Sequence, residues 1–360
     1  MRPNRCSARL VSLFLPLLAA FGARPVAALE LPCRHEDTLS EAAAELLLSG
    51  ARLRAETLLR RARAVGFDGV AVQAHEGLDD HALIAWLKLQ AERADAPLAC
   101  GEASSESRRV VLVSARGGRL QRIDGRVVGQ LAPGFRQPHL VLEDGDGRAE
   151  RIELRGEQLT QGISLPEARA WLRVQLVAEG PAGPRPVAEL ILGGEARAAL
   201  VEEPVAPEPP AVAKETAASA QSAPDAAARE RSQESLFARL TAFRRREGAP
   251  SVRDNQLLSV SAQRHATRVC ELGKVAHRLR DGEDPETRLR EEHIEARAVG
   301  EAVARASSAD AALSAVFDSP SHRLAVTEKA FTDAGIGRAY DTKGHTCLVV
   351  LLAAWPRRIP

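Results

Sequence analysis

Two histidines and a glutamate in the last third of the chain are the side chains whose types and spacing could do chemistry. They lie in the segments His277-Arg278-Leu279-Arg280-Asp281-Gly282, Gly300-Glu301-Ala302-Val303-Ala304 and Ser319-Pro320-Ser321-His322-Arg323. Imidazole and carboxylate groups that converge from separate turns are the usual components of a metal site or an acid–base site. We therefore take His277, Glu301 and His322 as the candidate site residues.

Two predicted helices flank these segments. Asp254 has the side chain and position of an N-cap, and apolar residues then recur at helical spacing as far as the stop at Gly273. Ser308 is placed to cap a second helix, Ala309 to Phe317, which ends at Pro320. The candidate residues thus lie close to predicted helix ends, where loops can bring them together.

Two strands complete the predicted carboxy-terminal domain. Ala334 to Tyr340 and Thr346 to Ala354 alternate or run apolar, and Lys343-Gly344 joins them. Ser232 is placed to cap a further helix before all of these elements, and Glu286 to Glu292 favours one more helical turn. Helices followed by a terminal hairpin predict an α+β domain of roughly 125 residues, which is large enough to fold alone.

The order of several short motifs resembles one known family. From about residue 236 to 355 the chain is similar to bacterial members of the CAP superfamily, which includes the cysteine-rich secretory, antigen-five and pathogenesis-related proteins and is also called SCP-like. The matching segments, in order, are His277 to Gly282, Arg288-Leu289-Arg290, Gly300-Glu301, Ser319 to Arg323, and Phe331-Thr332 leading into Gly335-Ile336-Gly337. Each motif is weak alone, whereas the ordered set is specific.

The resemblance implies an α-β-α sandwich, an extracellular location and a cleft in which His277, Glu301 and His322 face one another. The usual Gly-Glu-Asn of the family is Gly300-Glu301-Ala302 here. The second glutamate of many eukaryotic members falls near Ser319, so a full four-residue metal site is not expected. In the wider family such domains are linked with lipid or sterol binding and with cell-surface interaction.

Two functions remain open for these residues. His277, Glu301 and His322 could ligate zinc or another divalent metal with water in the open position, as in a metal-dependent hydrolase of peptides or the cell wall. Alternatively the histidines hydrogen-bond Glu301 and fix the surrounding loops. No HExxH motif or motif-marked nucleophile accompanies them. We therefore expect a binding or scaffold module rather than an enzyme, with an unknown protein or lipid ligand as partner.

The amino terminus has the pattern of a secretory signal peptide. Arg2, Arg5 and Arg9 form a positive region, Leu10 to Ala20 is apolar, and Val26-Ala27-Ala28 is a small-residue cleavage site. The apolar run is well short of the roughly 20 residues that span a bilayer. We expect no transmembrane segment after cleavage, and a protein that is secreted, periplasmic or at the cell surface.

The predicted organisation has five parts: a signal peptide at 1–28, a helical region at 29–105, an antiparallel β region at 106–195, an Ala/Pro/Glu-rich linker at 196–231, and the CAP domain at 232–360. Thr38 to Glu41 has capping-box spacing, and Asp80 is placed to cap a later helix. The β region could itself be the part that binds a partner. Its predicted strands are Val110 to Val113 paired with Leu120 to Val128, Leu140 to Leu142 paired with Ile152 to Leu154, Leu172 to Val177, and Val187 to Leu192.

Cysteine positions favour two disulfides. Cys6 would leave with the signal peptide, so the mature chain keeps Cys33, Cys100, Cys270 and Cys347. Three pairings are possible in principle, and the placement of two cysteines in each half favours Cys33 with Cys100 and Cys270 with Cys347.

Composition argues against nucleic acid as a partner. The net charge is +1, from 49 basic and 48 acidic residues that are interspersed, and 3% of the residues are aromatic. Such a chain offers neither a basic footprint for nucleic acid or anionic membranes nor many rings on which bases could stack.

Overall fold

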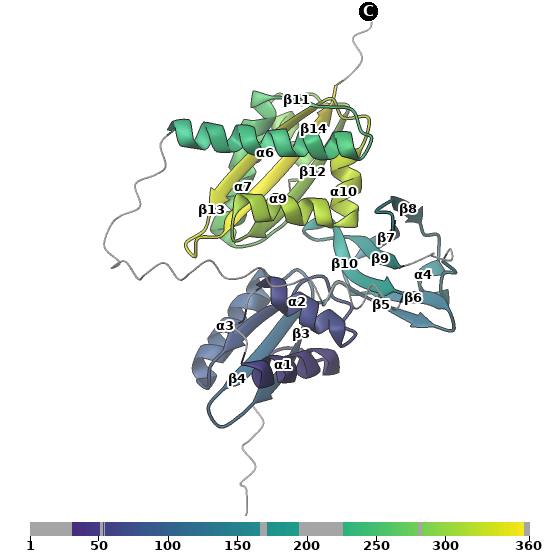
Figure 1. The fold of residues 1–360 in the computed structure, drawn as a ribbon, viewed down its shortest axis with the longest axis vertical. Coiled ribbons are helices and arrows are strands. Elements are labelled where there is room, and N and C mark those ends of the chain that lie inside the picture. The colour runs from purple at the N-terminus through teal and green to yellow at the C-terminus, as the bar shows by residue number, and fades with distance from the viewer. Residues whose placement is uncertain are drawn as a thin grey trace, which may run out of the picture. The chain divides into compact units, whose positions relative to one another are not determined.

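The computed structural model describes residues 31–50, 53, 55–165, 171–193, 226–279 and 283–355. The predicted signal peptide and most of the predicted linker lie outside these residues. Among the helices that are described, none combines the length and the apolar character needed to cross a membrane. The elements follow one another in three groups along the chain (Figure 1).

The first group contains helices and a four-stranded sheet. Its elements are β1 (Arg34–His35), α1 (Asp37–Ser49), α2 (Ala55–Ala64), β2 (Gln73–Glu76), α3 (Asp80–Arg93), β3 (Leu98–Ser104) and β4 (Arg109–Ala115). The strand order is β1-β3-β4-β2, with β1 parallel to β3 and the other pairs antiparallel. Leu39, Leu46 and Leu58 of the helices share a buried core with Leu112 of β4. The part predicted as helical therefore also contains strands, and the predicted boundary at residue 105 falls between β3 and β4.

Two helix starts in this group differ from prediction. Helix α1 has Glu36 at its N-cap without a side-chain cap bond, so the predicted capping box at Thr38 to Glu41 is wrong. The amide of Glu36 donates to the carbonyl of Cys100, which fixes the chain against β3 and starts the helix earlier. Helix α3 is capped by Asp79, one residue before the predicted Asp80.

The disulfide between Cys33 and Cys100 forms as predicted. It links the residue before β1 to the middle of β3, with Cα atoms 5.8 Å apart. The amino-terminal end of the described chain is thereby joined covalently to a strand that lies inside the sheet.

The predicted hairpin of Val110 to Val113 with Leu120 to Val128 is wrong. Strand β4 lies between β3 and β2, while β5 (Gly118–Ile123) pairs with β6 (Arg126–Leu131). All four residues of the Val110 to Val113 run are buried, as suits a central strand. A continuous apolar run specifies burial on both faces but not the partner strand, which is why adjacency in sequence misled the prediction.

The second group is an antiparallel sheet with its own core. The strand order is β10-β9-β7-β8, formed by β7 (Arg136–Asp144), β8 (Ala149–Glu153), β9 (Leu172–Gly180) and β10 (Gly183–Leu192), with the short helix α4 (Gln158–Gln161). Leu140 pairs with Ile152, which confirms that predicted hairpin, and the strands expected at Leu172 and Val187 are present. In the turn before β8, the side chain of Asp144 accepts hydrogen bonds from the amides of Asp146 and Arg148, which order the hairpin turn.

The third group is an α-β-α sandwich, which confirms the fold that the resemblance implied. Its elements are α6 (Ala226–Arg246), β11 (Arg253–Asp254), α7 (Gln256–Leu272), α8 (Pro285–Glu291), β12 (Ala298–Ala306), α9 (Ala309–Asp318), α10 (Pro320–Thr327), β13 (Asp333–Tyr340) and β14 (Thr346–Ala354). The strand order is β11-β13-β14-β12. Helices α6, α9 and α10 cover one face of this sheet, and α7 and α8 cover the other (Figure 1).

Strand β14 lies at the centre of the sandwich and is buried at all nine positions. Leu348, Val350 and Leu352 point into the core under α6 and α9. Val349 and Leu351 point into the core under α7. Both faces of the strand are therefore apolar, which explains why its sequence runs apolar instead of alternating with polar residues.

Helix α7 lies directly on the backbone of β13. A Cβ atom added at Gly335 would be 2.2 Å from the amide nitrogen of Ser259, and one added at Gly337 would be 2.2 Å from the carbonyl carbon of Ala262. The helix begins at its N-cap Asn255, one residue after the predicted Asp254, whereas Ser308 caps α9 as predicted. The loop that carries His277 follows this tightly seated helix.

We expect Gly337→Val to lower the free energy of unfolding by about 3 kcal/mol or more, because overpacking here has only main-chain atoms to displace. Gly344→Ala is the control, since nothing lies within 4 Å of a Cβ at that turn. Its positive φ of 81° should cost about 1–2 kcal/mol. Urea denaturation of the two variants measures both losses. A Gly337→Val protein as stable as the control would contradict the close approach.

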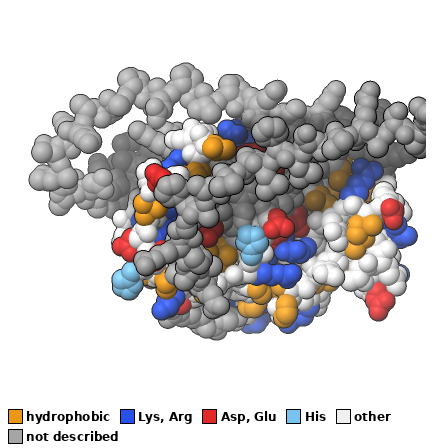
Figure 2. Space-filling view, turned by 90° about the horizontal axis from the view of Figure 1, so that it is seen from below, with side chains coloured by type: hydrophobic (Ala, Val, Ile, Leu, Met, Phe, Trp, Pro, Cys, Tyr) orange, Lys and Arg blue, Asp and Glu red, His pale blue; other side chains and the backbone are white. Residues whose placement is uncertain are grey.

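Charged side chains of both signs are mixed over the surface drawn in Figure 2. On that face, where it is not covered by grey atoms, Lys and Arg side chains lie next to Asp and Glu side chains and among hydrophobic ones. This agrees with the nearly balanced 49 basic and 48 acidic residues of the chain. No strongly one-signed field is expected from such a mixture.

Candidate functional site

The three candidate residues come from three different elements of the sandwich. Helix α7 ends at Gly273, whose left-handed backbone (φ 60°) turns the chain into the loop that holds His277. Glu301 lies on β12, and His322 lies in α10, which starts at Pro320. A helix end, a strand and a short helix therefore each supply one residue.

Glu301 is the centre of the arrangement. Its side chain is 1% exposed, and Oε1 lies 2.8 Å from Nδ1 of His277. Its other carboxylate oxygen, Oε2, accepts a hydrogen bond from the guanidinium of Arg288. Nε2 of His265 lies 3.8 Å from Oε1. We call Glu301, His277, Arg288 and His265 the Glu301 cluster.

Two members of this cluster were not among the predicted site residues. Arg288 lies in α8, and besides Glu301 it donates to the carbonyl oxygens of His277, at 2.8 Å, and Glu283, at 3.2 Å. His265 lies on the buried face of α7, where Nε2 is 2.9 Å from the carbonyl oxygen of Ala276. Both side chains thus fix the backbone on either side of His277, and Arg288 also holds the carboxylate.

The cluster keeps Glu301 ionised. Burial alone would raise the pKa of Glu301, but the hydrogen bond from His277 and the charges of His277 and Arg288 outweigh it and lower the pKa below its usual range. Burial also lowers the pKa of His265, against the opposing attraction of Glu301. The arrangement is a buried carboxylate held between a guanidinium and two imidazoles.

Comparison with known proteins matches the third group of elements to one family. The profile of CAP, the cysteine-rich secretory protein family, matches residues 237–352. Residues 237–352 form a CAP domain. No curated protein matches the chain in a sequence comparison.

Solved structures similar to the chain include three bacterial proteins. An outer surface protein from Borrelia burgdorferi is 20% identical, with 35% of this chain and 95% of that chain covered and a TM-score of 0.33. An extracellular protein containing a SCP domain from Bacillus anthracis is 17% identical, with 53% and 66% covered and a TM-score of 0.34. A cysteine-rich secretory protein from Staphylococcus aureus is 16% identical, with 58% and 65% covered and a TM-score of 0.29.

Within the CAP domain, His322 stands apart from the cluster. Among the described residues, no hydrogen bond joins it to His277 or Glu301. Removal from water, followed by the charge of His277, lowers the pKa of His322 to about 4. The structure thus joins His277 and Glu301 by a hydrogen bond, whereas burial and the charge of His277 lower the pKa of His322.

The contacts of Glu301 also concern the predicted metal site. In the described parts of the chain, no group of three or more His, Cys, Asp or Glu side chains is placed to hold a metal ion. Each oxygen of Glu301 is already engaged, one by His277 and the other by Arg288. An ionised carboxylate has about four lone-pair sites, so these two hydrogen bonds occupy only part of its capacity. Ligation by His277, Glu301 and His322 therefore stays a prediction.

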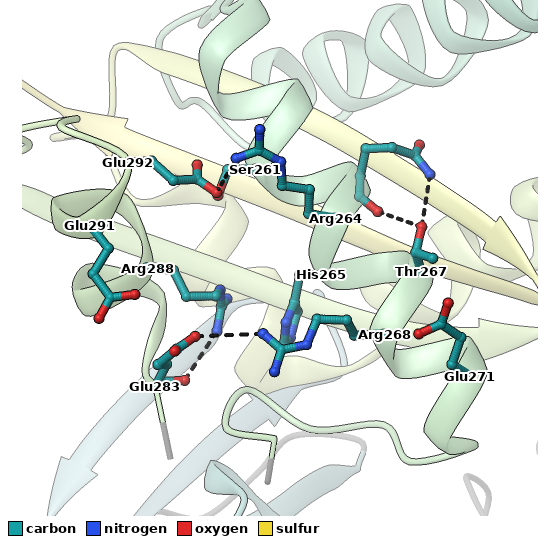
Figure 3. A pocket seen from close by; sticks show the side chains of 11 residues that line it. Ser261, Arg264, His265, Thr267, Arg268, Glu271, Glu283, Arg288, Glu291 and Glu292 are labelled. Carbon is teal, nitrogen blue, oxygen red and sulfur yellow. Dashed lines mark hydrogen bonds and ion pairs between the residues drawn. The ribbon is translucent and has the colours of Figure 1, made fainter. Parts of the chain in front are cut away.

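A pocket of about 510 Å³ opens between α7 and α8, beside the Glu301 cluster. Figure 3 shows His265 and Arg288 in this pocket, with Glu283 and Arg268 next to them. Arg268 and Glu283 form an ion pair at 3.5 Å. The remaining lining residues are Ser261, Gln263, Arg264, Thr267, Glu271, Glu291 and Glu292. The pocket lining therefore carries both positive and negative side chains, and its charge does not favour a ligand of either sign.

Acid should weaken the CAP domain through His322. Because the folded-state pKa of about 4 lies below the ordinary 6.5, the unfolded chain binds more protons between these values. The stability that neutral His322 contributes is therefore fully present above pH 6.5. As the pH drops toward 4, the free energy of unfolding falls by roughly 3 kcal/mol. Urea denaturation repeated from pH 7 to pH 4 measures this loss. Over that range the free energy of unfolding of His322→Gln should fall by roughly 3 kcal/mol less than that of wild type. Parallel curves for the two proteins would contradict the prediction.

Proposed function

We propose that the chain is an exported protein whose CAP domain binds a protein or lipid partner of the cell envelope, with the Glu301 cluster as an organising site and not a catalytic one. The observation that carries the proposal is that both oxygens of Glu301 accept hydrogen bonds, one from His277 and the other from Arg288. The disulfides Cys33–Cys100 and Cys270–Cys347 support export, because such bonds persist in oxidising compartments.

The chemistry of Glu301 suits a positioning role. A general base works best with a pKa near the operating pH. Glu301 instead has a pKa below its usual range, and both of its oxygens accept hydrogen bonds. The bond to Nδ1 fixes the ring of His277 and leaves Nε2 as the nitrogen that Glu301 does not engage. His277, with a side chain 13% exposed, is the most exposed member of the cluster.

The competing hypothesis is a metal-dependent hydrolase of peptides or the cell wall that uses His277, Glu301 and His322. It requires Glu301 to bind a metal ion through the lone pairs that Arg288 and His277 leave open. Zinc titration by calorimetry of the mature protein, from Leu29 onward, compared with His277→Ala and His322→Ala, addresses this directly. Saturable zinc binding that is lost in both variants, with zinc-dependent hydrolysis of casein or peptidoglycan, would replace our proposal by the hydrolase.

Binding itself is tested with isolated bacterial cell envelopes. The mature protein should co-sediment with the envelopes, and His277→Ala should reduce the bound fraction while the protein remains folded. The control is His81→Ala, because His81 is exposed on α3, outside the CAP domain. Equal sedimentation of wild type and His277→Ala would show that the cluster is not the binding site. Absence of sedimentation for all three proteins would contradict envelope binding.

A further inference from the structure

The turn between β9 and β10 is seated on the loop that carries His277. The carbonyl oxygen of Ala182 accepts hydrogen bonds from the amides of both His277 and Arg278, each at 3.0 Å. Ala182 is 2% exposed and belongs to the apolar core that includes Ala276 and Leu279. A single small residue of the β sheet is thus inserted into the CAP domain next to the candidate site.

Residues on either side of Ala182 also contact the loop that carries His277. The guanidinium of Arg278 forms an ion pair with Glu179, whose side chain is 13% exposed. A Cβ atom at Gly183 would lie 2.9 Å from Cβ of His277, and φ at Gly183 is 100°. Only glycine lets the chain pass this close to His277 in that conformation.

The same sheet also holds the segment around His322. The amide of Ser321 donates to Oε1 of Gln175, at 3.1 Å. Arg323 forms an ion pair with Glu143, at 2.8 Å. Arg173 donates to the carbonyl of Asp318, at 2.7 Å. Strands β7 and β9 therefore contact α10 immediately before and after His322, while the β9–β10 turn contacts the loop of His277.

These contacts are almost entirely polar. The core of the β sheet contains no residue of the CAP domain, and among the described residues the two CAP cores contain only Ala182 from the sheet. Two parts that keep separate cores and meet through hydrogen bonds and ion pairs have the kind of interface at which relative motion is the default expectation. The seated turn therefore has few apolar contacts to lose when it leaves.

We propose that the β9–β10 turn is a reversible plug of the CAP site, which shields His277 while seated and exposes it when displaced. A ligand that takes its place must present a hydrogen-bond acceptor to the amides of His277 and Arg278 and a negative charge to the Arg278 guanidinium. An extended peptide with an acidic residue three positions before a small one has this chemistry, as Glu179 and Ala182 do here. The inference rests on the proposed function, since it assigns regulation to that same site.

The test uses the full mature chain and the rate at which diethyl pyrocarbonate modifies each histidine, mapped by mass spectrometry. Glu179→Arg should raise the rate at His277 about tenfold, as expected when a charged hydrogen bond is lost from a closed state. The charge-swapped double variant, Glu179→Arg with Arg278→Glu, should return the rate toward wild type. Hydrogen exchange at the amides of residues 277 and 278 should change in parallel.

A second variant keeps the test independent of charge. Gly183→Val should also unseat the turn, with Gly125→Val as its control, because Gly125 has a positive φ of 78° and nothing within 4 Å of a Cβ. Unchanged rates at His277 in both Glu179→Arg and Gly183→Val, with native circular dichroism, would overturn the proposal. The rates are measured without any ligand, so they judge the plug even if envelope binding fails, and a failed plug leaves the envelope experiment unaffected.

Discussion

Glu301→Ala is expected to lower the free energy of unfolding by about 3–5 kcal/mol, the cost of removing one partner from a buried ion pair. The substitution leaves the guanidinium of Arg288, whose side chain is 9% exposed, without its carboxylate. It also removes the hydrogen bond that fixes His277. Urea denaturation at neutral pH measures the loss. Glu301→Gln, which keeps hydrogen-bonding atoms but not the charge, should lose less.

The matched control for Glu301→Ala is Glu286→Ala on α8. Glu286 pairs with Arg290 at 3.4 Å, and both side chains are more than 60% exposed. Such a pair contributes less than about 1 kcal/mol. If Glu301→Ala were as stable as Glu286→Ala and had lost a measurable hydrolytic activity, the enzyme hypothesis would displace the organising role. Stability without any loss of function would show that the cluster is dispensable.

Replacing both Cys270 and Cys347 by serine should destabilise the CAP domain by about 4 kcal/mol, as the chain-entropy model gives for a long closed loop. The bond spans 77 residues and joins the last turn of α7 to β14. Cys347 is 0% exposed and Cys270 is 7% exposed, so the substitution also places hydroxyl groups in the core. Urea denaturation of the double variant, monitored by circular dichroism, provides the measurement.

The pair Cys33 and Cys100 supplies the comparison for that disulfide. Its loop of 67 residues is nearly as long, so loop entropy alone would predict a similar loss. We expect a smaller loss, because β1 pairs with β3 at only two positions and can detach without unfolding the rest of the chain. Equal losses from the two double variants would show that the amino-terminal segment does not open locally.

Local sequence pattern was sufficient for one uniformly buried strand and one capped helix, whereas the caps of α3 and α7 lie one residue from their predicted positions. The run from Thr346 to Ala354 predicted β14 at its observed bounds, and Ser308 predicted the start of α9. By contrast β12 was not predicted, because Ala298 to Ala306 contains Gly, Glu, Ala and Arg, which have weak strand preference. Strand β12 forms because it pairs with β14 at nine positions, which compensates for the weak strand preference of its residues.

The candidate site was predictable only in part, because some of its contacts join elements that are far apart in the sequence. The ordered motifs placed His277 and Glu301 together, and the structure gives the bond between them. Arg288 and His265 complete the cluster from α8 and α7, and their helical patterns say which face is buried but not which carboxylate they meet. Partners that depend on how two helices lie across a sheet cannot be read from spacing along one segment.

The uniform burial of β14 has a consequence for how the protein must be made. A run such as Leu348-Val349-Val350-Leu351-Leu352 has high strand preference, no charge and no proline, which is the pattern of an aggregation-prone segment. In the finished protein, β12 and β13 occupy both of its edges. Before folding nothing covers it, and the adjacent Cys347 needs an oxidant to pair with Cys270. Production in a reducing cytosol should therefore yield insoluble chains, and production in an oxidising compartment should yield soluble ones.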